Sequence, residues 1–409
     1  MADREALSFR SRSEIDTFLQ TSQFNQQASP FVYQGWSRIN PHIRTERDTP
    51  ISNFGYSGNF RVEIDKDKTK IGECWLTWTR AALASSGTFQ RFQDFEGLAL
   101  IDSVEILHSD GMISRTTSEQ MFLEFRTMDR DKQVQWATHF LHGDLPPAQR
   151  NVLSASSQTL YVKLYNPLDK DMRLFMSIQS LGSKVTFKIT TRALGHITET
   201  DDTNTPTGGA ITNANLRTFN YHFSAEEKNF HNLRTKGTGM NYRVIEWSPL
   251  HVQNVATGVE STTVEYELSG LTGAAIDFIF VLYNTTSEDL VAANATNERF
   301  VYQTVDSFQG HIASTRVIPP QADVWNKHQH QLAYYQDATG DNIYRYSWSE
   351  NPDDPIGVWG HMGLSQLHPL KLELQHSSTA VTDTWKLRCY CRRNNWIKHQ
   401  NAKLQRLVH

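Results

Sequence analysis

Short runs in which apolar and polar residues alternate dominate the chain from Phe60 onward. In the first half the runs are Phe60–Ile64, Cys74–Trp78, Leu160–Leu164 and Val185–Ile189, together with a longer mixed run from Leu98 to Leu107. Alternation with a period of two is typical of strands that bury one face, and Gly, Asp, Asn and Pro residues separate these runs. The pattern therefore predicts the short strands of a β-sandwich or barrel.

The alternating pattern returns in the second half after a turn-rich stretch. Residues 199–215 contain no aromatic side chain and consist mainly of Asp, Thr, Asn, Gly and Pro, which predicts a linker or a long loop. Beyond this stretch the strand-like runs are Tyr242–Trp247, Thr263–Leu268, Ile276–Asn284, Ile343–Trp348, Leu370–Leu374 and Trp385–Cys391. We expect this half to be a second β-sandwich.

One helix is predicted among the strands of each half. In the first half Thr117 and Gln120 have the spacing of a capping box, and apolar residues follow at positions 121, 125 and 128. In the second half the stretch from Gln321 to Gln336 places Trp325, Leu332 and Tyr335 on one helical face. Both halves therefore follow the order strands, helix, strands.

The shared order of elements indicates an internal duplication. A local similarity supports it, because Ser180–Ser183 precedes the run Val185–Ile189 much as Gln366–Pro369 precedes Leu370–Leu374. We expect an all-β protein of two tandem eight-stranded jelly rolls (β-sandwiches) with short inserted helices. The predicted division is an N-terminal arm at 1–53, a first jelly roll at 54–198, a linker at 199–216 and a second jelly roll at 217–409.

The N-terminal arm is polar and carries a short predicted helix near Ser13–Leu19. Residues 1–50 contain six basic and six acidic residues, so this segment lacks the excess charge of a genome-binding arm. Its few large apolar residues cannot build a core, so we expect the arm to become ordered on assembly, against a neighbouring subunit or the inner base of an assembled unit. The start of the chain has no apolar segment of the kind found in signal peptides, and no run is long enough to span a bilayer.

Composition and charge narrow the range of functions. Ten Trp, fourteen Tyr and twenty-one Phe are a heavy aromatic content, which favours β structure and protein interfaces. The formal net charge of −4 gives no bulk attraction to nucleic acid. Cys74, Cys389 and Cys391 form no disulfide framework, so a reducing compartment is expected.

The C-terminal segment is locally basic. From Trp385 to His409 there are seven Lys or Arg residues and no acidic residue. Alternation predicts a core face with Trp385, Leu387, Cys389 and Cys391, and an opposite face with Lys386, Arg388, Tyr390 and Arg392. We expect the opposite face to be solvated; the alternative is contact with a genome or an internal membrane in a particle interior.

The order of several C-terminal motifs resembles the double-jelly-roll major capsid proteins of nucleocytoplasmic large DNA viruses and their relatives. The motifs are Tyr346-Ser-Trp348, Pro355-Ile-Gly357, the alternating run Leu370–Leu374, Asn394-Asn-Trp-Ile397 and the segment from Leu404 to Val408. In the first half, Leu160–Leu168 resembles the strand of that family that enters a proline–leucine turn. The serine–arginine pair that usually follows the proline–x–glycine turn is absent here, since no Arg follows Ser365.

This resemblance implies a structural protein of an icosahedral virus shell and not an enzyme. A homotrimer would form a pseudo-hexagonal capsomer, with neighbouring capsomers and minor capsid or penton proteins as partners. The chain would be located in the virion capsid after assembly in the host cytoplasm or nucleus. A scaffold or minor capsid protein is an alternative within the same class. No catalytic, cofactor-binding or metal site, no cofactor and no small-molecule substrate is predicted.

Two alternatives come from other classes of protein. Jelly-roll oxygenases bind a metal through a His-x-Asp motif and a distant His, and His108-Ser-Asp110 and His142-Gly-Asp144 match that spacing. Asp110-Gly111 is also a common hairpin turn, so we expect turn residues there. A carbohydrate-binding sandwich would make use of exposed Trp and Tyr residues, but it does not explain two similar halves.

Overall fold

The computed structural model describes residues 42–407 except for internal gaps. The gaps are 67–69, 85–89, 110, 128–129, 171–173, 201–206, 224–228, 230–231, 234, 238, 256–262, 285–298, 335–341, 355–358 and 377–384. The short helix predicted near residues 13–19 and the Pro355-Ile-Gly357 motif lie outside the described residues. Among the described residues, no helix is long and apolar enough to cross a membrane.

The first jelly roll is a sandwich of two four-stranded antiparallel sheets. One sheet has the spatial order β1 (His42–Pro50), β10 (Ile211–Phe223), β3 (Lys70–Arg80) and β7 (Gln158–Leu164). The other has the order β2 (Asn59–Ile64), β8 (Val185–Thr191), β5 (Ile101–His108) and β6 (Gly111–Thr117). A ribbon of β4 (Gln90–Phe92) and β9 (Thr198–Thr200) accompanies them.

The second jelly roll repeats this plan with two interrupted strands. The long strand β21 (Trp385–Gln400) lies between β14 (Gly273–Asn284) and the broken strand β11 (Met240–Trp247) with β12 (His251–Val255). On its other side β14 pairs with β18 (Ile343–Ser347), β19 (Met362–Leu364) and β15 (Tyr302–Gln303). The second sheet has the order β13 (Thr263–Leu268), β20 (Leu370–Gln375), β16 (Ser307–Ile312) and β17 (Thr315–Ala322). Finally, β22 (Lys403–Leu407) forms a hairpin with β21.

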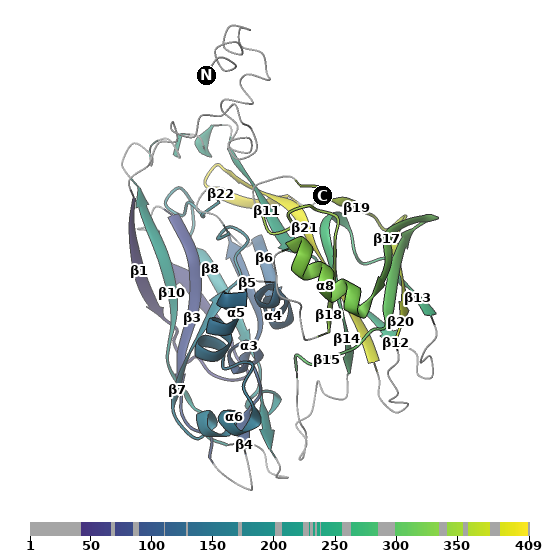
Figure 1. The fold of residues 1–409 in the computed structure, drawn as a ribbon. Coiled ribbons are helices and arrows are strands. Elements are labelled where there is room, and N and C mark those ends of the chain that lie inside the picture. The colour runs from purple at the N-terminus through teal and green to yellow at the C-terminus, as the bar shows by residue number, and fades with distance from the viewer. Residues whose placement is uncertain are drawn as a thin grey trace, which may run out of the picture.

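The two jelly rolls have the same topology. If β11 with β12 and β18 with β19 are each counted as one strand, and the additional strands β4, β9, β15 and β22 are left aside, both sandwiches have eight strands in the sheet orders 1-8-3-6 and 2-7-4-5. The runs at Val185–Ile189 and Leu370–Leu374, whose flanks looked alike in the sequence, both form the seventh strand. The two jelly rolls lie side by side in Figure 1. The predicted fold class is confirmed.

Each jelly roll inserts its main helices between its fifth and sixth strands. In the first these are α4 (Ser118–Arg126), α5 (Arg130–Trp136), the π-helical η2 (Ala137–Leu141) and α6 (Pro147–Ser154). In the second it is α8 (Asp323–Tyr334). The predicted capping box is present, because the Thr117 and Gln120 side chains cap each other's backbone N–H. Short helices α3 (Glu96–Leu100) and η3 (Leu194–His196) complete the first jelly roll, and α3 takes the start of the run predicted as a strand from Leu98.

Two strands lie where the sequence pattern placed an arm and a linker. Residues 42–50 form β1, and residues 211–216 begin β10, which pairs with both β1 and β3. The inward positions of β10 explain why its pattern was weak: Ala214, Leu216, Thr218 and Asn220 are buried, and only Leu216 is strongly apolar. The last strand of the first sandwich therefore continues to Phe223.

The strand β14 is buried on both faces. Its side chains Phe278, Phe280 and Leu282 belong to the core of the second jelly roll. The alternate side chains Ile279, Val281 and Tyr283 belong instead to the core that begins in the first jelly roll. The first jelly roll thus covers the outer face of this sheet, and one apolar core runs across the boundary between the two sandwiches.

Candidate functional site

The His-x-Asp motifs are engaged in structural contacts. His108 ends β5 and is buried, and its Nδ1 accepts a hydrogen bond from the Leu404 backbone N–H at 3.3 Å. Burial, reinforced by Lys66 and Lys403, lowers the pKa of His108. Asp110 lies outside the described residues. Within the described part of the chain, no three His, Cys, Asp or Glu side chains are grouped so that they could hold a metal ion.

The second motif forms part of a buried ionic cluster. His142 Nδ1 lies 3.2 Å from Glu96 Oε2, and Glu96 also pairs with Arg80 through a 2.5 Å contact. Asp144 pairs with Arg126 at 2.7 Å. Both side chains therefore have structural partners within the first jelly roll.

The three cysteines are buried thiols. Cys74, Cys389 and Cys391 are not in disulfides. Burial raises the pKa of each thiol well above its usual value. A protonated, inaccessible thiol is a poor nucleophile and a poor metal ligand, so these residues fill the core.

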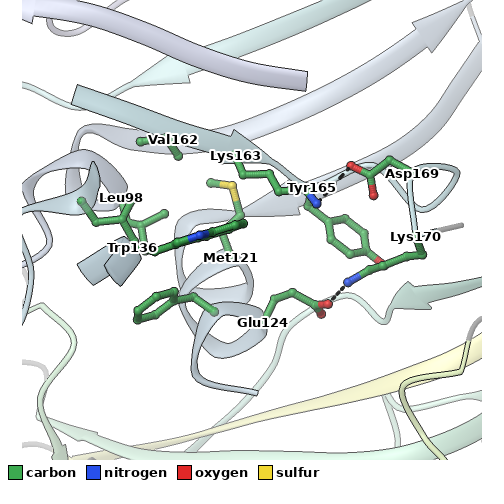
Figure 2. A pocket seen from close by; sticks show the side chains of 11 residues that line it. Leu98, Met121, Glu124, Trp136, Val162, Lys163, Tyr165, Asp169 and Lys170 are labelled. Atoms are coloured by element: carbon green, nitrogen blue, oxygen red, sulfur yellow. Dashed lines mark hydrogen bonds and ion pairs between the residues drawn. The ribbon is translucent and has the colours of Figure 1, made fainter. Parts of the chain in front are cut away.

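A small cavity lies between β7 and the inserted helices of the first jelly roll (Figure 2). Its volume is about 40 Å³, which is room for a few water molecules. Apolar side chains line most of it, including Leu98, Met121 and Trp136. At its polar end burial raises the pKa of Asp169 to about 7, and Lys163 lies 4.0 Å from that carboxylate. The cavity is a packing feature.

The most elaborate cluster joins the two jelly rolls at Glu119, in the first turn of α4. Its carboxylate accepts hydrogen bonds from Arg388 at 3.2 Å, from the Tyr302 hydroxyl at 3.3 Å and from the Tyr390 hydroxyl. Arg388 also stacks over the Tyr283 ring at 4.2 Å. One buried carboxylate of the first jelly roll thus binds β15 and β21 of the second.

Aromatic rings surround this polar contact. Phe122 on α4 stacks on Phe300 with ring centroids 4.4 Å apart, and Phe95 meets Phe300 edge-on at 6.2 Å. The Tyr165 hydroxyl donates to the Ile245 carbonyl at 2.6 Å, and the Gln120 side chain donates to the Ser248 carbonyl at 3.0 Å. An apolar centre with satisfied polar groups is typical of a permanent interface.

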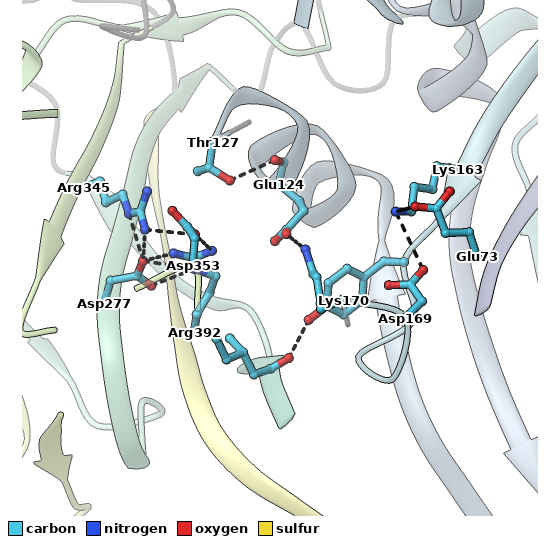
Figure 3. A network of polar contacts seen from close by, with 12 residues as sticks. Glu73, Glu124, Thr127, Lys163, Asp169, Lys170, Asp277, Arg345, Asp353 and Arg392 are labelled. Carbon is cyan, nitrogen blue, oxygen red and sulfur yellow. Dashed lines mark hydrogen bonds and ion pairs between the residues drawn. The ribbon is translucent and has the colours of Figure 1, made fainter. Parts of the chain in front are cut away.

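A second buried network lies on the same side of the second jelly roll (Figure 3). Asp277 accepts from Arg345 at 2.7 Å and from Arg392, and Arg392 also binds Asp353 at 2.6 Å. Burial opposes the charge of Asp353, but Arg392 and Arg345 outweigh it and hold its pKa well below the usual value. Across the boundary, Lys170 pairs with Glu124, and Figure 3 shows this pair facing the arginine cluster.

The C-terminal hairpin reaches back to the first jelly roll. The Gly182 N–H donates to the Ala402 carbonyl at 2.7 Å, and His399 Nε2 lies 3.3 Å from the Ser180 hydroxyl. The turn residues Asn401 and Ala402 both have positive φ, as a tight hairpin requires. Together with the Leu404–His108 bond, these contacts attach β22 to the end of the first sandwich.

The prediction of a solvated basic face on the last strand is wrong. The core face is as predicted, but Arg388 binds Glu119, Tyr390 is fully buried, and Arg392 binds Asp277 and Asp353. Acidic side chains distant in the sequence therefore pair with Arg388 and Arg392, whereas Lys386 of the predicted face is partly exposed.

Sequence reasoning missed the residues that build the interface. Glu119 was interpreted only as part of a helix start, and Tyr302 and Phe300 lay outside every predicted element. One signal was present in the sequence. Ala274–Tyr283 is the most apolar stretch of the chain, and a nearly continuous apolar run is typical of a strand that is buried on both faces.

Comparison with known proteins shows that the fold of this chain is similar to that of several solved structures. No family model and no curated protein sequence matches the chain. Among solved structures, PBCV-1 VP54 superposes with a TM-score of 0.72 at 12% identity, covering 92% of this chain and 98% of VP54. The Faustovirus major capsid protein gives a TM-score of 0.67 at 10% identity, with 98% of each chain covered. A chain in the structure of the Sputnik virophage gives 0.58 at 10% identity, covering 90% of this chain and 88% of that one. The chain therefore has the double-jelly-roll fold of these viral proteins.

Proposed function

We propose that this chain is a structural capsid protein that trimerises into pseudo-hexagonal capsomers and assembles an icosahedral virus shell. The observation that carries the proposal is the buried interface between two sandwiches of identical topology. Because β14 and β21 are covered on both faces, the two jelly rolls form one rigid block. Three such blocks around an axis supply six similar wedges, which suits hexagonal packing.

The fold likeness supports the same proposal. The similar structures include a major capsid protein and the PBCV-1 capsid, and they match over nearly their whole length. The chain would act in the virion capsid, with itself and neighbouring capsomers as partners. Minor capsid or penton proteins would occupy positions that a trimer cannot fill.

A non-enzymatic role fits the state of the candidate chemical groups. Burial raises the pKa of each cysteine thiol, and His142 and Asp144 contact Glu96 and Arg126. The cavity beside β7 has a volume of only about 40 Å³. These features favour rigidity over catalysis.

We further propose a domain division at a later position than the sequence pattern indicated. The first jelly roll would comprise residues 42–223 and the second residues 240–407, because β1 and β10 pair within the first sandwich. The joining segment would then lie between Phe223 and Met240.

Light scattering and negative-stain microscopy of the purified chain test the proposal. We expect a mass of three chains that persists at micromolar concentration, and particles with a near-hexagonal outline. A monomer at all concentrations with no shell formation would refute the capsomer role. Trimers that are found only at special positions of a virion would indicate a minor capsid or scaffold role.

A further inference from the structure

The helix α8 exposes two adjacent apolar side chains in its first turn. Val324 is 77% exposed and Trp325 is 54% exposed, although Asn326 beside them is fully buried against β18. The inner side of the helix is fixed by Asp323, which accepts from the Tyr344 hydroxyl at 2.7 Å. An exposed Trp on a helix whose inner side is bound to its own jelly roll is a frequent interface anchor, because Trp is enriched at binding hot spots.

The equivalent helix of the first jelly roll shows what such a face contacts. Both α4 and α8 follow the fifth strand of their sandwich. Within the chain, α4 packs on the outer face of the sheet that contains β21, the eighth strand of the second jelly roll, through Glu119 and Phe122. The matching partner for α8 is therefore the outer face of an eighth strand in a first jelly roll, which is β10.

The outer face of β10 has suitable chemistry. Its buried positions alternate with the partly exposed residues Arg217, Phe219 and Tyr221. Arg44 from β1 stacks over the Phe219 ring at 4.2 Å. In β21 the outer face likewise has an arginine followed two residues later by an aromatic residue, Arg388 and Tyr390, and α4 covers them. Strand β10 itself lies on the side of the molecule away from the second jelly roll (Figure 1).

We propose that Val324 and Trp325 on α8 of one copy dock on the Arg217–Tyr221 face of β10 in a second copy. This contact repeats between chains the contact that α4 makes with β21 within a chain. It joins two different surfaces, so successive copies are related head to tail, and the three-fold symmetry of the proposed trimer closes them into a ring. The inference rests on the proposed trimer and names its contact surfaces.

Charge substitutions on the two surfaces test the contact. Val324→Glu with Trp325→Glu, and separately Phe219→Glu, should convert trimers to monomers in light scattering at micromolar concentration, with thermal unfolding nearly unchanged. The control is Leu367→Glu, because Leu367 is 88% exposed in the loop before β20 and should leave trimers intact. Trimers that persist in both variants would overturn the inference and leave the capsomer proposal standing.

Cross-linking gives a second readout that does not require a stable trimer. We would mix Trp325→Cys with Phe219→Cys at high concentration and add a short bis-maleimide; the native cysteines are buried. The mixture should give cross-linked dimers, and the double variant should give covalent trimers. If the wild-type chain is monomeric, the capsomer proposal fails. The cross-linking reaction then decides by itself whether α8 of one copy docks on β10 of another. No cross-link in the mixture, or dimers of Trp325→Cys alone, would contradict head-to-tail docking.

Discussion

At the scale of single residues, Glu119 joins the first jelly roll to three residues of the second, Tyr302, Arg388 and Tyr390. Glu119→Gln keeps the shape of the side chain but removes the charge opposite Arg388, which is only 12% exposed. Breaking a buried ion pair from one side leaves an uncompensated charge, so we expect a loss of about 2–4 kcal/mol in the free energy of unfolding. Urea titration measures this loss.

The matched control is an exposed pair. Lys371 and Glu265 lie 2.8 Å apart with exposed fractions of 37% and 49%. Glu265→Gln should cost less than about 1 kcal/mol, because solvent already screens that pair. Equal losses in the two variants would mean that Glu119 does not hold the jelly rolls together.

His108 makes the attachment of the C-terminal hairpin sensitive to acid. Burial and the nearby Lys66 and Lys403 lower its folded-state pKa below 6.5, so the folded protein binds fewer protons there than the unfolded chain. Its contribution to stability is complete above a pH of about 6.5 and is lost as the pH falls below that value. Protonation also removes the acceptor for the Leu404 N–H.

The pH dependence can be isolated with a variant. Between pH 7.5 and pH 5, wild type should lose more stability than His108→Leu, as measured by urea unfolding at each pH. The exposed His361 provides the control, and His361→Leu should follow the wild-type pH dependence. Parallel curves for wild type and His108→Leu would show that His108 does not titrate in this range.

At the scale of elements, β1 tests where the first jelly roll begins. It is an edge strand with nine residues in register with β10, and Asp48 pairs with Arg217 at 2.7 Å. Deleting residues 1–50 removes this ladder and should lower the Tm by on the order of 5–10 °C. Deleting residues 1–41 removes none of it and should cost much less. Equal Tm values for the two truncations would place β1 outside the cooperative fold.

The strands that the sequence predicted are those with one apolar face. Val185–Ile189 and Leu370–Leu374 alternate clearly, because one side meets the core and the other meets polar surroundings. Strand β10 was missed because Thr218 and Asn220 occupy inward positions. Alternation alone thus reveals a strand only where its inward residues are apolar.

The candidate site was much less predictable than the fold. The partners of Glu119 lie in β15 and β21, far along the chain, and only the packing of complete sandwiches brings them together. The same limit produced the error at Arg388 and Arg392, since a local excess of basic residues says nothing about acidic partners supplied by another element. A run of basic residues predicts a solvated strand face only where that face is known to be exposed.

At the scale of the whole molecule, the shared core predicts that the two jelly rolls unfold together. Tandem domains with small contacts unfold separately, whereas here Ile279, Val281 and Tyr283 of the second sandwich belong to the core of the first. We expect one calorimetric transition whose van't Hoff and calorimetric enthalpies agree. Two resolved transitions in wild type would mean that the interface couples the sandwiches weakly.

Two phenylalanine variants distinguish the loss of contacts between the sandwiches from the loss of core packing within one sandwich. Phe300 lies at the interface against Phe122, whereas Phe308 lies within the second core. Each Phe→Ala change should cost about 3–5 kcal/mol because each ring is buried. Phe308→Ala should lower the midpoint temperature of the transition and leave it a single transition. Phe300→Ala should also split or broaden it, because the lost contacts are those that join the sandwiches. If both variants keep one sharp transition, the cooperativity must reside in other contacts, and the polar cluster at Glu119 is the first to examine.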